Sequence, residues 1–161
     1  PLLRSEDNIA LFERHGVLNR AEINSRVDIV LENYTKTIHI EALTLLEMIN
    51  REVIPAITLY SNLLCETINN KASIRADSSV EYELLSRLTA CSKELFSLSS
   101  SLKMAVASAE RSNDILKKAN EYHDNILKIM ADIRKYADSA ESVVPPSYWP
   151  YPTFGELLFK I

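Results

Sequence analysis

Residues 27–67 carry the strongest pattern in the chain: VDIVLENYTKTIHIEALTLLEMINREVIPAITLYSNLLCET. Apolar or small residues recur there in alternating steps of three and four, at Val27, Leu31, Tyr34, Ile38, Ala42, Leu45, Ile49, Val53, Ala56, Tyr60, Leu63 and Thr67. This spacing places a single stripe along one face of a helix for about eleven turns. The pattern therefore predicts one very long amphipathic helix.

Local signals set the ends of this helix and of a shorter one before it. Asn19, followed three residues later by Glu22, forms an approximate capping box, so the long helix is predicted over about 19–70. Pro55 lies inside the stripe and predicts a kink or short break near 51–54, because proline cannot donate the backbone hydrogen bond of a helix. Ser5 and Gly16 bound a short first helix over about 5–15.

The next helices follow a polar stretch, 69–79. One is predicted over about 79–111, with its stripe at Leu84, Leu88, Cys91, Leu95, Leu98, Leu102, Ala105 and Ala109. Polar residues at 112–114 permit a reversal of the chain. A helix is predicted over about 114–143, with apolar or small residues at the same spacing of three and four: Ile115, Ala119, Tyr122, Ile126, Ile129, Ile133, Tyr136, Ala140 and Val143. A bend in one very long helix over 79–143 is the alternative.

The fold class that follows is all-α. Before residue 145 the chain has one glycine and two prolines and is rich in strong helix formers, and it shows no alternating strand pattern. We predict an antiparallel bundle of three to four long helices over residues 1–144, with residues 145–161 as an extended tail of the same domain.

The tail differs in composition from all that precedes it. Residues 144–161 read VPPSYWPYPTFGELLFKI and hold four of the six prolines and the only tryptophan. Prolines stiffen the backbone and large aromatic residues dominate docking energies, so we predict a docking segment. Its predicted anchors are Tyr148, Trp149, Tyr151, Phe154, Leu157, Leu158 and Phe159. Docking on another domain is favoured, and folding back over its own bundle is the alternative.

Charge and hydropathy narrow the class of partner. The 18 basic and 22 acidic side chains give a net charge of −4 without a basic cluster, which argues against nucleic acid and anionic membranes as partners. No apolar run reaches the length of a spanning helix and no signal peptide is visible, so we expect a cytoplasmic protein. Cys65 and Cys91 are too few for a disulfide framework, and both are predicted to be small core residues on the apolar stripes.

No catalytic, cofactor or metal site emerges from the sequence. Two isolated glycines cannot build a phosphate loop, and His15, His39 and His123 lack the spacing of a metal site. The carboxylates Glu41, Glu47, Asp138 and Glu141, like Glu121 beside Lys117 and Lys118, are predicted to lie on a solvated, ion-paired helix face. On the third helix, Tyr82, Leu85 and Phe96 lie off the stripe and indicate a second contact face.

Several blocks of the sequence resemble the region that follows the catalytic domain in type III glutamine synthetases. The N-terminal blocks are NIALFERHGVL (8–18), EINSR (22–26), ENY (32–34), IHIEAL (38–43) and VIPA (53–56). The C-terminal blocks are MADIR (130–134), Ala137, Asp138, Glu141 and YWPYPTFGELLF (148–159), the last being the most specific. Residues 65–110 carry no such pattern.

This resemblance implies a C-terminal domain without a catalytic site of its own. Members of the family make glutamine from glutamate, ammonia and ATP with magnesium or manganese, in ring-built homo-oligomers. The resemblance places the cofactor and metal sites in a separate catalytic domain, so none is assigned to this chain. The expected partners are the catalytic domain of the same polypeptide and neighbouring subunits. A freestanding helical adaptor that binds a partner helix is the main alternative, followed by a small enzyme with an unrecognised site.

Overall fold

The computed structural model describes residues 2–152 and 154–158, and no strand occurs within them. A 3-10 turn η1 (Leu2–Arg4) and a short helix α1 (Glu6–Arg14) precede α2 (Arg20–Met48). Next come the π-helical segment η2 (Ile49–Val53), α3 (Ile54–Ser73) and α4 (Ser79–Glu110). The chain continues through α5 (Ile115–Glu121), the π-helical segment η3 (Tyr122–Ile126), α6 (Leu127–Glu141) and α7 (Phe154–Leu158).

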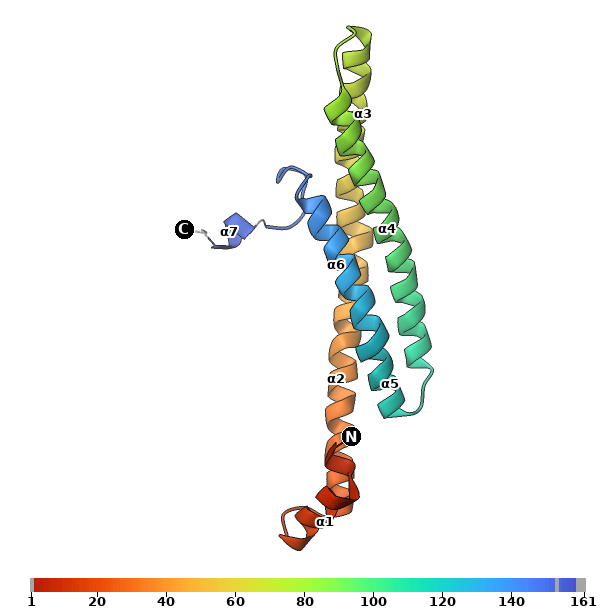
Figure 1. The fold of residues 1–161 in the computed structure, drawn as a ribbon, viewed down its shortest axis with the longest axis vertical. Coiled ribbons are helices and arrows are strands. Elements are labelled where there is room, and N and C mark those ends of the chain that lie inside the picture. The colour runs from red at the N-terminus through yellow and green to blue at the C-terminus, as the bar shows by residue number, and fades with distance from the viewer. Residues whose placement is uncertain (1, 153, 159–161) are drawn as a thin grey trace.

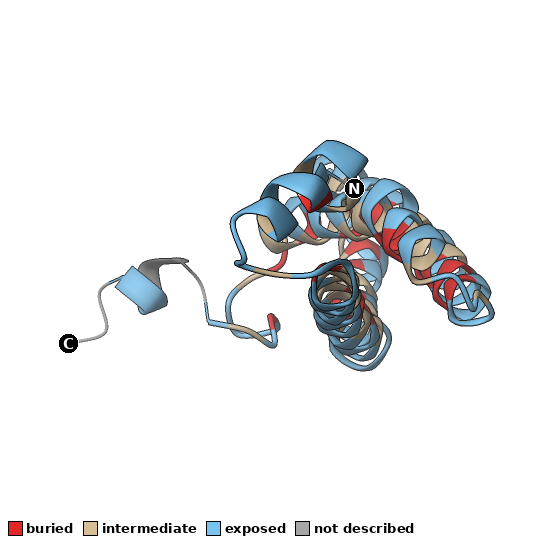
Figure 2. Ribbon diagram, turned by 90° about the horizontal axis from the view of Figure 1, so that it is seen from below, coloured by how far each residue is buried: buried red, intermediate tan, exposed pale blue. Residues whose placement is uncertain are grey.

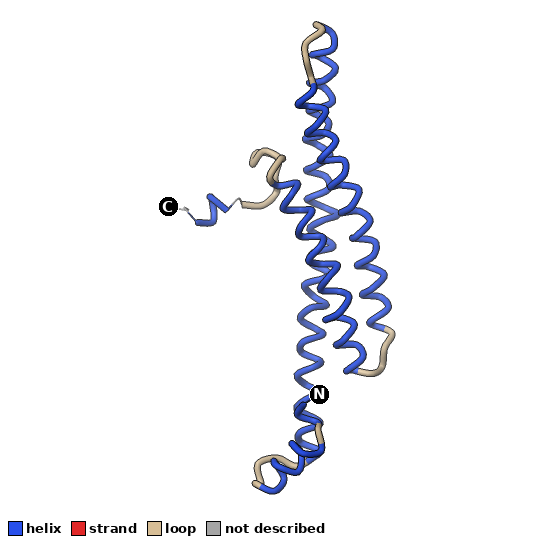
Figure 3. Tube along the Cα trace, in the orientation of Figure 1, coloured by secondary structure: helices blue, strands red, loops and turns tan. Residues whose placement is uncertain are grey.

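Three long antiparallel columns form the bundle (Figure 1). The first is α2–η2–α3, the second is α4 and the third is α5–η3–α6. Figure 3 shows turns only between the columns, near the N-terminal end and in the tail. The all-α bundle predicted from the stripes is therefore confirmed, and the reversal at 112–114 divides 79–143 into two helical columns rather than one bent helix.

The core is formed by buried residues of all three columns, and Figure 2 colours the buried residues red. Its largest members with almost no exposed surface are Ile49, Ile57, Leu88, Leu95, Leu102, Tyr122, Ile126 and Ile133. The predicted stripe of α4 is confirmed, since every one of its eight members is buried or half-buried. Cys91 belongs to this core, whereas Cys65 is exposed, so the prediction of a core position for Cys65 is wrong.

The break predicted before Pro55 is the π-helical segment η2, Ile49–Val53. Pro55 has no N–H to donate and its ring crowds the carbonyl one turn earlier, so a wider turn fits there better than a regular α-helical one. The column does not end at this point, because the residues that cap η2 on both sides keep α-helical backbone angles. The kink thus takes the form of one extra residue within a continuous helix.

That extra residue shifts the buried stripe of α3 by one position. The sequence pattern placed Leu63 and Thr67 in the core, but Leu63 is 39% exposed and Thr67 only half-buried. The predicted Ala56 is buried at the start of α3, but the further buried positions are Ile57, Leu64 and Ile68. One added residue turns the following helix by about 100° relative to an uninterrupted α-helix, which accounts for the shift. The prediction of a core position is therefore wrong for Leu63, for a definable geometric reason, whereas Thr67 lies half-buried at the edge of the core.

Two helix ends use the same cap with different residues. Gly16 ends α1 at a φ of +62°, and the N–H of Val17 reaches the carbonyl of Phe12 at 3.0 Å. Arg75 ends α3 at a φ of +57°, and the N–H of Ala76 reaches the carbonyl of Lys71 at 2.9 Å. Both are Schellman motifs, which require the left-handed conformation that glycine adopts without strain.

Substitutions at these two caps should have opposite effects. We expect Gly16→Ala to lower the free energy of unfolding by about 1 kcal/mol, because a Cβ is strained at positive φ even in open space. Arg75→Gly should raise it by about 0.5 kcal/mol, since relief of that strain exceeds the added freedom of the unfolded chain. Urea unfolding followed by circular dichroism measures both changes, and equal signs for the two variants would contradict this account of the caps.

Candidate functional site

The tail begins with a tight turn that returns the chain to the bundle. The N–H groups of Tyr148 and Trp149 both donate to the carbonyl of Pro145, at 2.9 and 3.1 Å. Trp149 is only 9% exposed and belongs to the main core, and the ring of Tyr148 lies 5.7 Å from that of Tyr60 on α3. The first part of the predicted docking segment therefore packs on the chain's own bundle.

Beside Trp149 the bundle forms an apolar groove of about 680 Å³ between α2–η2 and α6. Tyr151 and Pro152 of the tail join Trp149 in its wall. Burial, with the Glu52 carboxylate nearby, raises the pKa of the Tyr151 phenol above its ordinary value. The groove is lined mainly by Ile40, Leu45, Met48, Ile49, Leu127, Met130 and Ala131.

The second part of the tail leaves the bundle. Figures 1 and 2 both show α7 apart from the three columns. Leu157 is 66% exposed and Leu158 72% exposed. This short helix occupies a segment that the sequence predicted to be extended. Phe154 begins α7 but its side chain is not described, and Phe159 lies outside the described residues, so docking through these residues stays a prediction.

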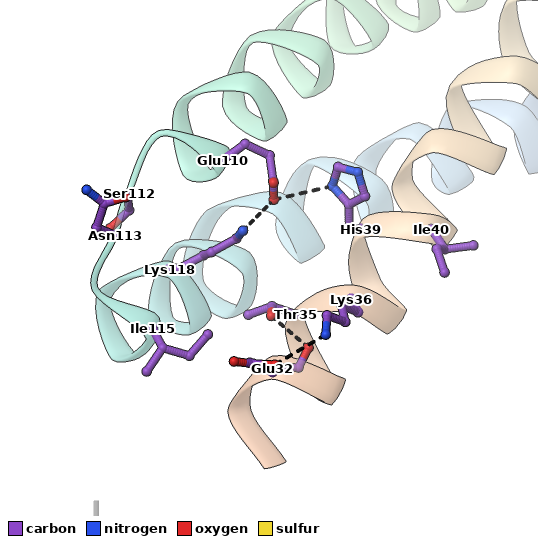
Figure 4. Close-up of a pocket in the computed structure, with 10 residues that line it drawn as sticks. All are labelled: Glu32, Thr35, Lys36, His39, Ile40, Glu110, Ser112, Asn113, Ile115 and Lys118. Carbon is purple, nitrogen blue, oxygen red and sulfur yellow. Dashed lines mark hydrogen bonds and ion pairs between the residues drawn. The ribbon is translucent and has the colours of Figure 1, made fainter. Parts of the chain in front are cut away.

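A polar pocket of about 710 Å³ lies near the α4–α5 turn (Figure 4). Its walls come from α2, the end of α4 and the start of α5. The Glu110 carboxylate is its centre, because its Oε1 accepts hydrogen bonds from the Lys118 ammonium and the Tyr122 hydroxyl, each at 2.8 Å. One carboxylate oxygen thus joins the second column to the third.

His39 extends this network to α2. Its Nδ1 lies 2.8 Å from the Tyr122 oxygen and 3.6 Å from Glu110 Oε1. The single hydroxyl proton of Tyr122 is donated to Glu110, so the proton of the second hydrogen bond must be carried by His39 Nδ1. The donor count therefore assigns the Nδ1–H tautomer to the neutral imidazole, and all three columns meet at the Tyr122 oxygen.

The environment acts in opposite directions on the two acids of this cluster. The hydrogen bond from Lys118, with a further one from Tyr122, lowers the pKa of Glu110 below its ordinary value. Burial, reinforced by the Glu110 carboxylate, raises the pKa of the fully buried Tyr122 phenol. Glu110 is therefore held as a carboxylate and Tyr122 as a neutral donor, an arrangement that stabilises the junction of the columns.

The Glu110 carboxylate should make stability depend on pH. Its pKa is lowered in the folded state, so its contribution is complete above the unfolded pKa, near its ordinary value of 4.5, and is lost as pH falls through the folded pKa. We expect Glu110→Gln to flatten the fall in unfolding free energy between about pH 5 and pH 3. Glu121→Gln is the control, because Glu121 bonds only to Asn125 on the same helical column. Equal slopes for wild type and Glu110→Gln would contradict this role.

The sequence did not predict this cluster, although one signal for it was present. Tyr122 falls on the apolar stripe of its helix, and a buried tyrosine needs a partner for its hydroxyl. The partners come from residues 83 and 12 positions away, which periodicity cannot locate. Lys118 was expected to pair within its own helix near Glu121, but it binds Glu110 on α4 instead.

The other polar residues singled out in the sequence are scattered. His15 ends α1, and the exposed His123 contacts Asp124. Glu47 pairs with Arg51 at 2.8 Å and Asp138 with Arg134 at 3.8 Å, as predicted for an ion-paired helix face. Asp138 also lines the apolar groove, together with Glu41 and Glu141. In the described part of the chain, no group of three or more His, Cys, Asp or Glu side chains is placed to hold a metal ion. The same residues include no helix long and apolar enough to cross a membrane.

Sequence comparisons connect this fold with a known domain. The family model described as "Glutamine synthetase C-terminal domain" matches residues 1–72, from the N-terminal turn through most of α3. A glutamine synthetase of Butyrivibrio fibrisolvens is 39% identical over 163 residues, covering 100% of this chain and 23% of the relative. A type-3 glutamine synthetase of Dictyostelium discoideum is 28% identical, covering 98% of this chain and 22% of the relative.

A third relative also aligns with most of this chain but through only a small part of its own length. The glutamine synthetase of Bacteroides fragilis strain YCH46 is 26% identical over 151 residues, covering 89% of this chain and 20% of the relative. The chain thus spans less than a quarter of the length of the curated relatives it matches. Two of these alignments cover nearly every residue, tail and bundle together. The chain belongs to the glutamine synthetase C-terminal domain family.

Proposed function

We propose that this chain is a non-catalytic accessory domain of a type III glutamine synthetase, which packs on the catalytic part of the enzyme and supports its assembly. The parent enzyme would ligate ammonia to glutamate at the expense of ATP. Its ATP and its magnesium or manganese ions would bind in the catalytic part. The proposal is supported by three relatives, all named glutamine synthetases and all more than four times the length of the matched region.

The observation that carries the docking role is the division of the tail into an anchored and a projecting part. Trp149 is held in the bundle core, and the chain then extends outward to α7, where Leu157 and Leu158 are 66% and 72% exposed. Two adjacent leucines on a helix that stands off its own bundle gain free energy when another surface covers them. The catalytic part of the same enzyme, or that of a neighbouring subunit, is the surface we assign to them.

The cytoplasm is the proposed location. Cys65 and Cys91 are both free thiols, and thiols persist in that form in a reducing compartment. The net charge of −4 disfavours nucleic acid and anionic membranes as partners, so the proposed contacts are with protein alone. A freestanding adaptor would instead use exposed residues such as Phe96 and Met104 on α4, but the relatives favour the accessory role.

The role of α7 is tested by placing charge on its leucines in the full-length enzyme. We expect Leu157→Asp/Leu158→Asp to weaken the association of subunits by about 2 kcal/mol or more, because two carboxylates would be desolvated in the contact. Mass photometry across a dilution series measures the shift in assembly. Leu59→Asp is the control, since Leu59 on α3 is 62% exposed and lies in the bundle. An identical dilution curve for the double variant and the wild type would contradict docking of α7 on a neighbouring subunit.

The non-catalytic character of the domain is tested separately. Purified residues 1–161 should form no glutamine from glutamate, ammonia and ATP above the background of the assay. The parent enzyme, assayed at the same molar concentration, is the positive control. Turnover by the isolated domain that rises in proportion to its concentration would overturn this part of the proposal.

A further inference from the structure

The N-terminal end of the domain extends beyond the bundle. Figure 1 shows η1, α1 and the first turns of α2 continuing past the α4–α5 turn. Both η1 and α1 contact α2, and Arg4 of η1 bonds to Asn24 and Asp28 in this part of it. Ile9 and Ile23 are each 2% exposed there and lie outside the main core. This end is therefore a small helical hook with its own apolar centre.

One face of the hook is open and carries exposed apolar side chains. A shallow hollow of about 690 Å³ lies along one face of α2, and a second hollow of about 510 Å³, with a mixed polar and apolar lining, lies at the α1–α2 turn and shares Asn19 and Glu22 with it. We call the joined surface the hook groove and define it by Val17, Ala21, Ser25, Arg26, Ile29 and Val30. Val17, Ile29 and Val30 are 61%, 55% and 65% exposed, so most of their side-chain surface is uncovered in the described chain.

Several interactions hold the hook in shape. Arg4 bonds to the Asn24 carbonyl and the Asp28 carboxylate of α2. Arg20 makes a two-pronged contact with Glu6 at 2.8 and 2.6 Å. The Asn19–Glu22 capping box is complete at the start of α2. These interactions fix the shape of the hook groove before any partner binds. Arg4 contacts α2 at Asn24 and Asp28, which lie less than two helical turns before Val30.

We infer that the hook groove receives the catalytic part that precedes this domain in the same polypeptide. The inference rests on the proposed function and names the contact surface within it. More than three quarters of each relative lies outside the matched region. If the parent enzyme is built in the same way, its catalytic part is joined to this domain at η1, beside the groove. The family model's match also contains the whole hook.

The chemistry of the groove defines what fits it. Its apolar residues suit a ridge of aliphatic or aromatic side chains. Arg26 is exposed, and no hydrogen bond or ion pair joins it to another residue of the described chain. Glu13 and Glu22, in contrast, are engaged with the backbone of the turn. The partner surface is therefore an apolar ridge that carries a carboxylate opposite Arg26.

Site-specific photo-crosslinking in the full-length enzyme tests this contact. A benzophenone amino acid replaces Val30 in one variant and Val80 in the control. Val80 is similarly exposed, at 63%, but lies at the start of α4, where it meets the turn from α3. We expect position 30 to form crosslinks with peptides that precede residue 1 of the same subunit, in several-fold higher yield than position 80.

Each outcome of this experiment decides for or against the inference. Crosslinked peptides within one subunit, without a band of doubled mass on a denaturing gel, support it. A band of doubled mass alone, or equal yields from positions 30 and 80, overturns it. A second experiment tests the contact independently. Loss of the contact in Ile29→Glu/Val30→Glu should make the segment before residue 1 several-fold more sensitive to limited proteolysis. If the crosslink forms but removal of the domain leaves assembly unchanged, the proposed function fails and the contact stands.

Discussion

Replacing Trp149 with alanine should lower the free energy of unfolding of the domain by about 3 kcal/mol, at the lower end of the range for truncation of buried tryptophan. Trp149 is 9% exposed and packs in the same core as Val144, which is 4% exposed. The truncation leaves a cavity where the tail meets the groove between α2 and α6. Guanidinium unfolding followed by circular dichroism measures the loss.

Tyr148→Ala is the matched control for this effect. Tyr148 neighbours Trp149 in sequence but is 37% exposed and contacts mainly the Tyr60 ring. We expect its truncation to cost about 1 kcal/mol or less, because a surface aromatic pair contributes little beyond its modest burial. Equal losses for the two variants would show that Trp149 does not anchor the tail.

Inserting one alanine after Arg51 should have a still larger effect. Because η2 already accommodates one extra residue, a second would rotate α3 by about 100° relative to α2. Ile57, Leu64 and Ile68 would leave the core, and Ala56, Leu63 and Thr67 would take their places. Since only Leu63 is as large as the residue it replaces, the net loss of two buried isoleucine side chains predicts a decrease of about 4 kcal/mol in unfolding free energy.

The substitution Arg51→Ala is the matched control, because it introduces an alanine at the same place without changing the number of residues. The Arg51 side chain is 76% exposed and pairs with Glu47 on the helix surface, so its truncation should change stability by about 0.5 kcal/mol or less. Thermal and urea unfolding of both variants provide the comparison. An insertion variant as stable as Arg51→Ala would contradict the assignment of the buried face of α3.

The bundle was predictable because its signals are local and repeated. The Asn19–Glu22 pair gave the start of α2, and the regular stripe of α4 survived unchanged in the core. Pro55 gave the place of the helix defect but not its form. A kink keeps the residue count per turn, whereas a π-helical segment adds one residue, and only the second changes which side chains of α3 are buried.

The spacing of apolar residues in the sequence could not predict the polar cluster or the course of the tail. His39, Glu110 and Tyr122 come from three columns, and their meeting depends on how the columns pack. In the tail, composition identified a segment with docking residues, but it could not show that Trp149 packs inward while Leu157 and Leu158 remain exposed. That division follows from the turn at Pro145, which brings Trp149 back to the core.

The most direct test of the account is the size of the full-length enzyme with and without this domain. The domain is removed by a stop codon before residue 1, and both proteins are weighed by mass photometry at equal subunit concentration. We expect the truncated enzyme to shift to smaller assemblies, and the purified domain to have no glutamine-forming activity. A truncated enzyme with the same number of subunits per particle as the intact one would contradict it.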